Sequence, residues 1–189
     1  MIFLFKKVQD AGNIYLCTMK TVKRTTVAFS GHRSFKMTDP GGDLFAARDG
    51  QTESDIYARL RETISNLAEE GFTDFLCGMA EGFDLLAGEA VLELRGKYAD
   101  LRLIAVIPFP RQAVGFKPET RESYYEVLGN AWEIFTVCPQ YSTDCFHRRN
   151  DYLIDNSSVL VCFYNGTRGG TQYTVKRALK NGLRIINIF

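Results

Sequence analysis

Three short segments carry residue types that bind phosphate groups in α/β proteins, and each directly follows an apolar, strand-like run. They are Ser30-Gly31-His32-Arg33, the loop from Gly78 to Asp84, and Gly169-Gly170-Thr171. Glycines leave backbone N–H groups accessible, a following helix adds partial positive charge, and arginine pairs with anions. The loops that follow parallel strands meet at one edge of the sheet. The pattern therefore predicts a crevice for a nucleotide-like ligand.

The last of these segments is the strongest candidate for a phosphate site. Gly169 and Gly170 expose backbone N–H groups, and Thr171 adds a hydroxyl at the start of a helix. A simple helix-entry turn is the alternative interpretation. In the first segment Arg33 is the better anion ligand. His32 either binds a ligand or has a structural role, in which it caps a helix or hydrogen-bonds a neighbouring loop.

The middle segment contains carboxylates as well as glycines. Gly78 and Gly82 either serve a ligand or simply permit a tight turn between strand and helix. Asp84, in the first turn of the next helix, is either a charge partner for the helix N-terminus or a ligand for a ribose hydroxyl. Glu81, Asp84 and Glu89 are candidate catalytic carboxylates for an N-glycosidic hydrolase, which would stabilise an oxocarbenium-like ribose.

The elements that must position these loops alternate between strand and helix. Strands are expected at 25–29, 73–77, 101–107, 133–137, 158–163 and 184–188, with helices at 52–70, 82–98, 119–130, 144–156 and 171–181. The first helix has a capping-box signature at Thr52 and Asp55, and Gly71 as its stop. Such alternation implies right-handed crossovers. We predict a Rossmann-like, doubly wound α/β fold with a mainly parallel six-stranded sheet and helices on both faces.

Length and composition are consistent with one domain. Of 189 residues, we expect 25–189 to form a single domain and 1–24 to be an N-terminal extension without a clear periodic pattern. The chain has 23 lysines and arginines against 22 acidic residues, so we do not expect nucleic acid to be a partner. Five scattered cysteines without a C-x-x-C pair, and no signal or membrane segment, indicate reduced thiols in a cytoplasmic protein. No metal site is expected.

The segment between the first strand and the first helix is far longer than an ordinary βα loop. Residues 34–51 include Pro40 and several glycines, and Phe35 and Phe45 look exposed. Long loops at a functional edge often act as lids, so this segment is a candidate lid.

Five short motifs, in order, resemble the YpsA-like family of the SLOG superfamily, which also holds DprA/Smf proteins and the LOG phosphoribohydrolases. They are Val27 to Arg33, the Gly78 to Asp84 loop, Ile107-Pro108-Phe109 followed by Gln112, Arg149-Asn150 with Asp155, and Gly166 with Gly169-Gly170-Thr171. The resemblance covers about Thr25 to Phe189. It implies a Rossmann-like fold whose members bind nucleotides, nucleotide derivatives or nucleic acid.

The residue pattern and the resemblance together define the expected ligand-binding set. It comprises Ser30, Gly31, His32, Arg33, Gly78, Met79, Ala80, Gly82, Asp84, Pro108, Phe109, Arg149, Asn150, Gly169, Gly170 and Thr171. Arg149 enters this set through the family pattern alone. No cofactor is required, although a nucleotide or nucleotide derivative could be the ligand.

Two departures from better-understood relatives bear on function. LOG enzymes carry a catalytic glutamate where this chain has Thr174, and DprA proteins carry an arginine where it has Glu81. Binding or sensing of a nucleotide-like small molecule is therefore the first hypothesis. An N-glycosidic hydrolase is the alternative and DprA-like binding of single-stranded DNA the second alternative, so whether the chain is an enzyme stays open. Relatives often dimerise, which leaves a homo-oligomer possible, and no membrane partner is expected.

Overall fold

The computed structural model describes residues 25–38, 44–46 and 52–189. The N-terminal extension at 1–24 lies outside the described residues, as does the candidate lid apart from 34–38 and 44–46. The side chain of Phe45 is likewise not described.

Within the described residues, six strands form one parallel sheet in the order β6-β5-β4-β1-β7-β8. These strands are β1 (Thr26–Gly31), β4 (Asp74–Cys77), β5 (Arg102–Ile107), β6 (Glu133–Thr136), β7 (Val159–Phe163) and β8 (Arg184–Asn187). The predicted parallel six-stranded sheet is confirmed. The strand order extends in one direction from β1 to β6 and in the other from β7 to β8, so the sheet reverses its winding between β1 and β7.

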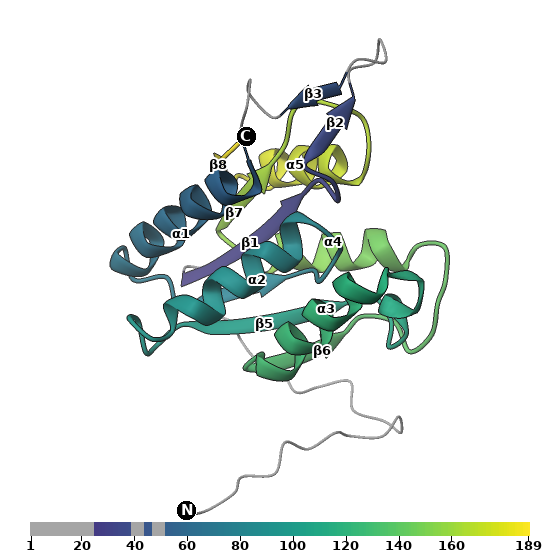
Figure 1. Ribbon diagram of the computed structural model, residues 1–189, viewed down its shortest axis with the longest axis horizontal. Coiled ribbons are helices and arrows are strands. Elements are labelled where there is room, and N and C mark those ends of the chain that lie inside the picture. Colours follow the sequence, from purple (N-terminus) through teal and green to yellow (C-terminus); the bar gives the residue numbers. More distant parts are fainter. Residues whose placement is uncertain (1–24, 39–43, 47–51) are drawn as a thin grey trace, which may run out of the picture.

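Helices cover both faces of this sheet, as predicted (Figure 1). They are α1 (Glu53–Glu69), α2 (Phe83–Leu94), α3 (Pro118–Asn130), α4 (Cys145–Asp155) and α5 (Gly170–Lys180), and a 3-10 turn, η2, spans Gln112–Gly115. Buried side chains of α1, α2 and α3 share one core cluster, and those of α4 and α5 share the other. No helix in the described part of the chain is long and apolar enough to span a membrane.

Alternation along the central strand produces these two cores. Val27 and Phe29 of β1 point into the cluster beneath α1 and α2, whereas Ala28 points into the cluster beneath α4 and α5. In the first cluster Phe29 stacks on Phe75, with ring centroids 5.9 Å apart, and meets Phe83 edge to face at 6.5 Å. This packing fixes β1, β4 and the start of α2 against one another.

The first helix shows how local sequence sets an element's limits. The side chain of Thr52 accepts a hydrogen bond from the Asp55 backbone N–H, and the Asp55 side chain accepts one from Thr52, which completes the predicted capping box. Ile56, Leu60, Ile64 and Leu67 form the buried stripe of this helix. Their spacing of three to four residues places them all against the sheet.

The long segment after β1 differs from expectation in two ways. It contains a small antiparallel hairpin of β2 (Lys36–Thr38) and β3 (Leu44–Ala46), where no strand was predicted. Phe35, predicted to be exposed, is half-buried and packs edge to face on Phe163 with centroids 5.7 Å apart. Phe35 thus packs against the first core cluster, next to Phe163 at the end of β7.

Candidate functional site

A pocket of about 270 Å³ opens at the carboxyl end of β1, beside the point where the sheet reverses its winding. The end of β1 and the residues after it supply Phe29, Ser30, Gly31, His32 and Arg33. The loop after β4 and the start of α2 supply Ala80 and Asp84. On the other side lie Phe146, Arg149, Asn150 and Leu153 of α4, with Gly170 and Thr171 of α5. The three predicted loops thus meet in one pocket, at the position where open α/β sheets bind ligands.

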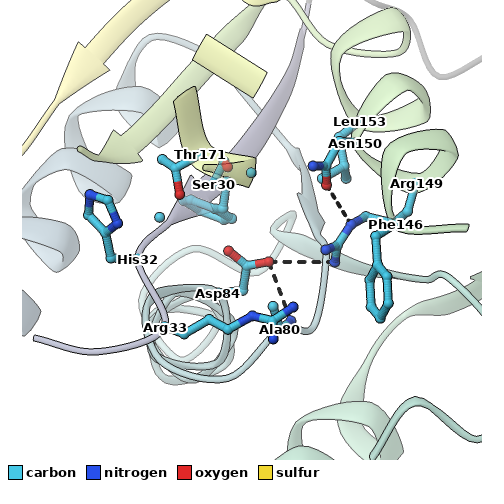
Figure 2. Close-up of a pocket in the computed structure, with 13 residues that line it drawn as sticks. Ser30, His32, Arg33, Ala80, Asp84, Phe146, Arg149, Asn150, Leu153 and Thr171 are labelled. Carbon is cyan, nitrogen blue, oxygen red and sulfur yellow. Dashed lines mark hydrogen bonds and ion pairs between the residues drawn. The ribbon is translucent and has the colours of Figure 1, made fainter. Parts of the chain in front are cut away.

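The centre of the pocket holds a buried ion pair. Nη1 of Arg149 lies 3.7 Å from Oδ2 of Asp84, and each of these side chains is only 6% exposed. Arg149 donates a hydrogen bond from Nη1 to the carbonyl of Gly78 and one of 2.8 Å from Nε to Oδ1 of Asn150. Figure 2 shows Asp84 between Arg149 and Arg33. The Asp84 carboxylate is therefore already paired with a side chain of the protein.

Burial opposes the charged forms of both partners. It raises the pKa of the Asp84 carboxyl, while the Arg149 guanidinium and the backbone N–H groups of Ala80 and Gly31 act in the lowering direction. Burial likewise lowers the pKa of Arg149, an effect that Asp84 opposes. A guanidinium keeps its proton even so. The pair therefore holds two opposite charges together at the centre of the pocket.

The loop after β4 is shaped around this pair. Met79 has a left-handed backbone with φ 58°, and its carbonyl accepts a hydrogen bond from Nε2 of buried Gln112. A Cβ at Gly78 would lie 2.2 Å from Nη1 of Arg149 and 2.7 Å from Oδ2 of Asp84. Glycine is required at position 78 because the two ionic side chains occupy the space beside it.

The loops after β1 and β4 also touch through their backbones. The N–H of Phe83 donates to the carbonyl of His32 at 3.2 Å. Gly82 has φ +77°, and a Cβ there would lie 2.5 Å from the carbonyl oxygen of Arg33. The N-terminus of α2 therefore reaches the pocket directly below the end of β1.

His32 connects the pocket to the loop after β7. Its Nε2 accepts a hydrogen bond of 3.3 Å from the backbone N–H of Asn165, and its ring stacks on Tyr164 with centroids 6.0 Å apart. Burial lowers the pKa of His32, although a separate contact with the Asn165 side chain acts in the raising direction. The loop-bonding alternative considered for His32 is thus present in the structure, and the ring also lines the pocket.

Arg33 lies at the mouth of the pocket. Its side chain is exposed, and its guanidinium carbon lies 5.8 Å from the centre of the Phe146 ring. This cation–π contact holds the charged group across the pocket from α5 without enclosing it. Arg33 can therefore approach an anion with little further desolvation.

The N-terminus of α5 forms the opposite wall. Gly169 is the N-cap residue. In the part of the chain that the structure describes, no side chain caps the helix and no heavy atom lies within 4 Å of a Cβ built on Gly170. The first N–H groups of α5 have no partner within the helix, and Gly170 and Thr171 at this end both line the pocket. Thr174 is buried and turned back on its own helix, since its Oγ1 donates to the carbonyl of Gly170 at 3.0 Å.

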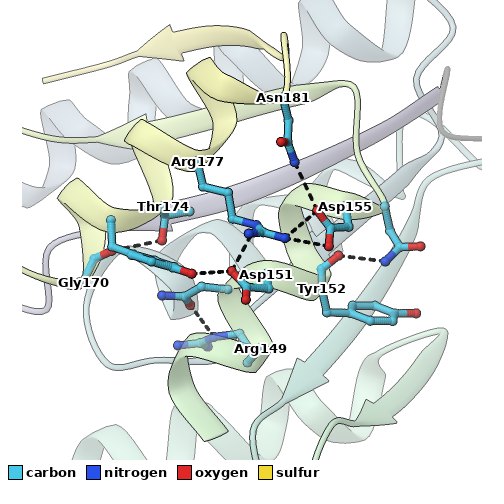
Figure 3. Close-up of polar contacts among 11 residues, drawn as sticks. Arg149, Asp151, Tyr152, Asp155, Gly170, Thr174, Arg177 and Asn181 are labelled. Carbon is cyan, nitrogen blue, oxygen red and sulfur yellow. Dashed lines mark hydrogen bonds and ion pairs between the residues drawn. The ribbon is translucent and has the colours of Figure 1, made fainter. Parts of the chain in front are cut away.

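Polar contacts between α4 and α5 fix the two walls relative to each other (Figure 3). Tyr173 donates to Asp151 at 2.7 Å, and Arg177 contacts Asp151 at 3.0 Å and Asp155 at 2.8 Å. Asn181 adds a hydrogen bond of 3.1 Å to Asp155. These contacts determine how far the α5 N-terminus stands from the Arg149 side of the pocket.

Not every residue of the expected set lines the pocket. Ser30, Gly31, His32, Arg33, Ala80, Asp84, Arg149, Asn150, Gly170 and Thr171 do. Gly78, Met79, Gly82 and Gly169 shape the loops just behind it. Pro108 and Phe109 do not line it. They follow β5, which is two strands away from β1, and the ring of Phe109 packs on the lining residue Phe146.

Sequence reasoning missed Phe29, Phe146 and Leu153 as lining residues. A signal for two of them was present: Phe146 precedes Arg149 by three residues and Leu153 follows Asn150 by three, so helical spacing puts them on the same face of α4. Phe29 is the last residue of β1 whose side chain belongs to the core cluster beneath α1 and α2.

The candidate catalytic carboxylates are separated by the fold. Asp84 lines the pocket, whereas Glu81 and Glu89 do not. Burial raises the pKa of Glu89, a hydrogen bond from Ser123 of α3 opposes the shift, and Glu126 adds to it. Glu89 therefore faces the helical layer. Among the described residues, no group of three or more His, Cys, Asp and Glu side chains is placed to hold a metal ion.

The chain is similar in sequence to known proteins. A family model described as the YspA SLOG family matches residues 27–185. UPF0398 proteins of Bacillus thuringiensis strain Al Hakam and Bacillus cereus strain AH187 are each 29% identical over 130 residues, which is 67% of this chain and 71% of theirs.

Two solved structures of DNA processing protein A are similar in fold. The protein from Streptococcus pneumoniae matches with a TM-score of 0.59 and 20% identity, over 88% of this chain and 50% of that one. The protein from Helicobacter pylori, whose structure describes a single-stranded DNA binding mode, matches with a TM-score of 0.58 and 17% identity, over 89% of this chain and 66% of that one. The chain thus spans about half the length of the Streptococcus pneumoniae protein. The similarity in fold confirms the predicted Rossmann-like architecture.

Proposed function

The chain belongs to the YspA SLOG family, and on that premise we propose that it binds a nucleotide or nucleotide-derived small molecule in the pocket beside β1. The observation that carries this proposal is the meeting of an accessible arginine and an open helix N-terminus. Arg33 and the first N–H groups of α5 stand on different sides of one pocket, beside the hydroxyl of Thr171. A phosphate group can be bound from both directions there.

The size of the pocket limits the ligand. Sites for drug-sized ligands commonly enclose roughly 300 to 1,000 Å³, so a pocket of about 270 Å³ favours a single nucleotide or a phosphorylated sugar over a dinucleotide. The ring of Phe146 and the side chain of Leu153 supply an apolar wall for a base or sugar. Ser30 and Asn150 supply polar groups for hydroxyls.

The charge of the pocket supports an anionic ligand. Asp84 is paired with Arg149 in the interior, so their charges offset each other, and Arg33 remains as the accessible charge at the mouth. A monoanionic or dianionic phosphate can pair with Arg33 without displacing the buried pair.

The test is a thermal-shift panel of AMP, ADP, ATP and inorganic phosphate. A ligand at about 100 times its dissociation constant stabilises the folded state by about 2.7 kcal/mol, which raises the melting temperature of a domain this size by about 5 to 10 °C. Arg33→Ala should weaken binding by about tenfold or more. Arg61→Ala, which removes an exposed arginine paired with Glu93 on the helical face, should leave binding unchanged. Absence of a shift with every member of the panel would reject a nucleotide site.

Single-stranded nucleic acid is a second candidate. The likeness to the Helicobacter pylori protein, whose structure describes single-stranded DNA binding, tells against our expectation that nucleic acid is not a partner. The same pocket could receive one nucleotide of a strand. An oligothymidylate should then compete with a bound mononucleotide, and only the oligonucleotide's affinity should fall steeply with salt, since each neutralised phosphate releases counterions. Failure to compete would exclude this second use of the pocket.

A further inference from the structure

The peptide group between Met79 and Ala80 has a partner on each side. Its carbonyl accepts a hydrogen bond from Nε2 of Gln112, and its N–H donates to Oδ2 of Asp84 at 3.4 Å. Figure 2 shows this N–H contact beside the ion pair of Asp84. The carbonyl and the N–H of a planar trans peptide point in opposite directions, so a contact that holds the carbonyl also sets the direction of the N–H.

The backbone at this point has a conformation that residues other than glycine rarely adopt. Met79 has φ 58°, in the left-handed region, and its side chain is fully buried. Such a conformation persists where the surrounding contacts hold it. Arg149 holds the peptide before Met79 through the carbonyl of Gly78, and Gln112 holds the peptide after it.

Gln112 extends from a turn that is fixed on two sides. It begins η2, and the next residue, Ala113, is buried in the first core cluster. Arg121 of α3 donates from Nη2 to the carbonyl of Val114 at 3.1 Å and to that of Phe116 at 2.8 Å. The core and α3 thus hold the turn from which the Gln112 side chain reaches the loop after β4.

A packing role alone does not account for a glutamine at position 112. Gln112 is 7% exposed, and its Oε1 is buried without a hydrogen-bond partner among the described residues. Burial of an incompletely bonded amide costs free energy, so an apolar side chain of the same length would fill this space at less cost. The hydrogen bond to the Met79 carbonyl is what an apolar side chain could not make.

From this geometry we infer that Gln112 is a positioning residue of the pocket, which by holding the Met79 carbonyl keeps the Ala80 N–H directed at Asp84. Ala80 and Asp84 line the pocket, whereas Gln112 does not. Gln112 therefore acts on a ligand only through this peptide group. The part of the inference that concerns binding rests on the function proposed above.

The direction of this peptide group determines the charge that a ligand meets at Asp84. In the orientation that Gln112 holds, the Asp84 carboxylate has the Arg149 guanidinium at 3.7 Å and a hydrogen bond from Ala80. If the peptide turned over, the Met79 carbonyl would replace that N–H, and two acceptor oxygens would face each other. The carboxylate would lose part of its compensation, and its negative charge would oppose the binding of an anionic ligand.

The sequence allows this one peptide group to be observed alone. Met79-Ala80 is the only place in the chain where an alanine follows a methionine. A full chain labelled with carbonyl-¹³C methionine and ¹⁵N alanine therefore gives a single NMR cross peak between a labelled carbonyl and a labelled amide. The cross peak reports the Met79 carbonyl and the deuterium exchange of the Ala80 N–H together.

We expect the Ala80 amide of the parent chain to be protected from exchange. Gln112→Met removes the donor at nearly constant side-chain length, and should make this amide exchange about tenfold faster and move the carbonyl resonance. Gln112→Leu should act in the same way and is the second variant should the first not fold. Gln140→Met, at an exposed position outside the pocket, should leave the cross peak unchanged.

Nucleotide affinity is the second measurement. Gln112→Met should weaken binding of the most stabilising nucleotide about fivefold or more, and Gln140→Met should leave it unchanged. A parent chain that binds no nucleotide would contradict the proposed function, but the cross peak would still decide the role of Gln112.

Three results would overturn the inference. The first is an Ala80 amide that exchanges in the parent chain as fast as in an unfolded one. The second is a folded Gln112→Met or Gln112→Leu variant that keeps the exchange rate and the carbonyl resonance of the parent, even if it melts at a lower temperature, because Gln112 would then serve stability alone. The third is a variant whose cross peak changes while its nucleotide affinity does not, which would remove the effect on binding.

Discussion

Arg149 and Asp84 meet inside the protein with Nη1 and Oδ2 3.7 Å apart, although they come from helices that cover opposite faces of the sheet. Asp84 lies in the first turn of α2, which covers one face of the sheet, and Arg149 lies in α4, which covers the other. They reach each other past the end of β4, where Gly78 has no side chain. The pair therefore ties the two helical layers together at the pocket.

Removing only the Arg149 cation should lower the unfolding free energy more than removing both charges of the pair. Arg149→Met leaves Asp84 buried without its partner, which costs about 3 to 5 kcal/mol of unfolding free energy for pairs of this kind. Asp84→Asn combined with Arg149→Met should recover part of that loss. Urea unfolding measures both, and Arg148→Met, at the exposed neighbouring position, is the matched control. Equal stability of the Arg149→Met variant and the parent would show that the pair is not structurally important.

Gly170→Val tests the wall formed by α5. No heavy atom of the described residues lies within 4 Å of a Cβ built at this position, so a substitution there causes no clash at the Cβ. The branched methyl groups would instead occupy the space in front of the helix N-terminus, and we expect nucleotide affinity to fall by about tenfold or more with little change in melting temperature.

Gly129→Val is the control for this substitution. Gly129 lies in α3 and does not line the pocket, and no heavy atom of the described segments lies within 4 Å of a Cβ built there. Isothermal titration with the nucleotide that gives the largest thermal shift compares the two variants. Equal affinities would remove α5 from the binding site.

Periodicity alone was sufficient to predict the sheet and the helices. The alternation of apolar strand-like runs with amphipathic segments determines a parallel sheet, and the loops after β1, β4 and β7 meet because the winding reverses there. The hairpin of β2 and β3 escaped prediction because three-residue strands are too short to show a period.

The interior of the site could not be predicted in the same way. Sequence reasoning treated Asp84 as a helix charge partner or a ribose ligand and found Arg149 only through family resemblance. Their contact depends on how two helices on opposite faces pack against the sheet, which no local pattern encodes. The ring of Phe35 shows the same limitation, because its burial depends on Phe163, far along the chain.

The titration of His32 should reveal the burial of its ring beside the loop after β7. Burial lowers the pKa of His32, so its folded-state pKa lies below the unfolded value of about 6.5. The unfolded state then binds more protons as the pH falls below that value. The stability that depends on neutral His32 is complete above about pH 6.5 and is lost as the pH falls through the folded-state pKa.

Proton NMR of the two histidine rings can measure this directly. His147→Gln assigns the signals, since His32 and His147 are the histidines of the chain. We expect the His32 midpoint to lie below about 6.5, and Tyr164→Ala to shift it by removing the stacked ring. A midpoint above that of a free histidine would contradict the buried, hydrogen-bonded ring.

Release of the free base from a nucleotide would distinguish an N-glycosidic hydrolase from a protein that only binds the nucleotide. LOG enzymes carry a glutamate where this chain has Thr174, and Thr174 is buried with its hydroxyl bonded to the carbonyl of Gly170. Asp84 lines the pocket but is paired with Arg149, and Glu81 and Glu89 do not line it. We therefore expect little or no free adenine from AMP by chromatography. Release at about 1 per second or faster, abolished by Asp84→Asn in a folded variant, would instead establish an N-glycosidic hydrolase with Asp84 at its centre.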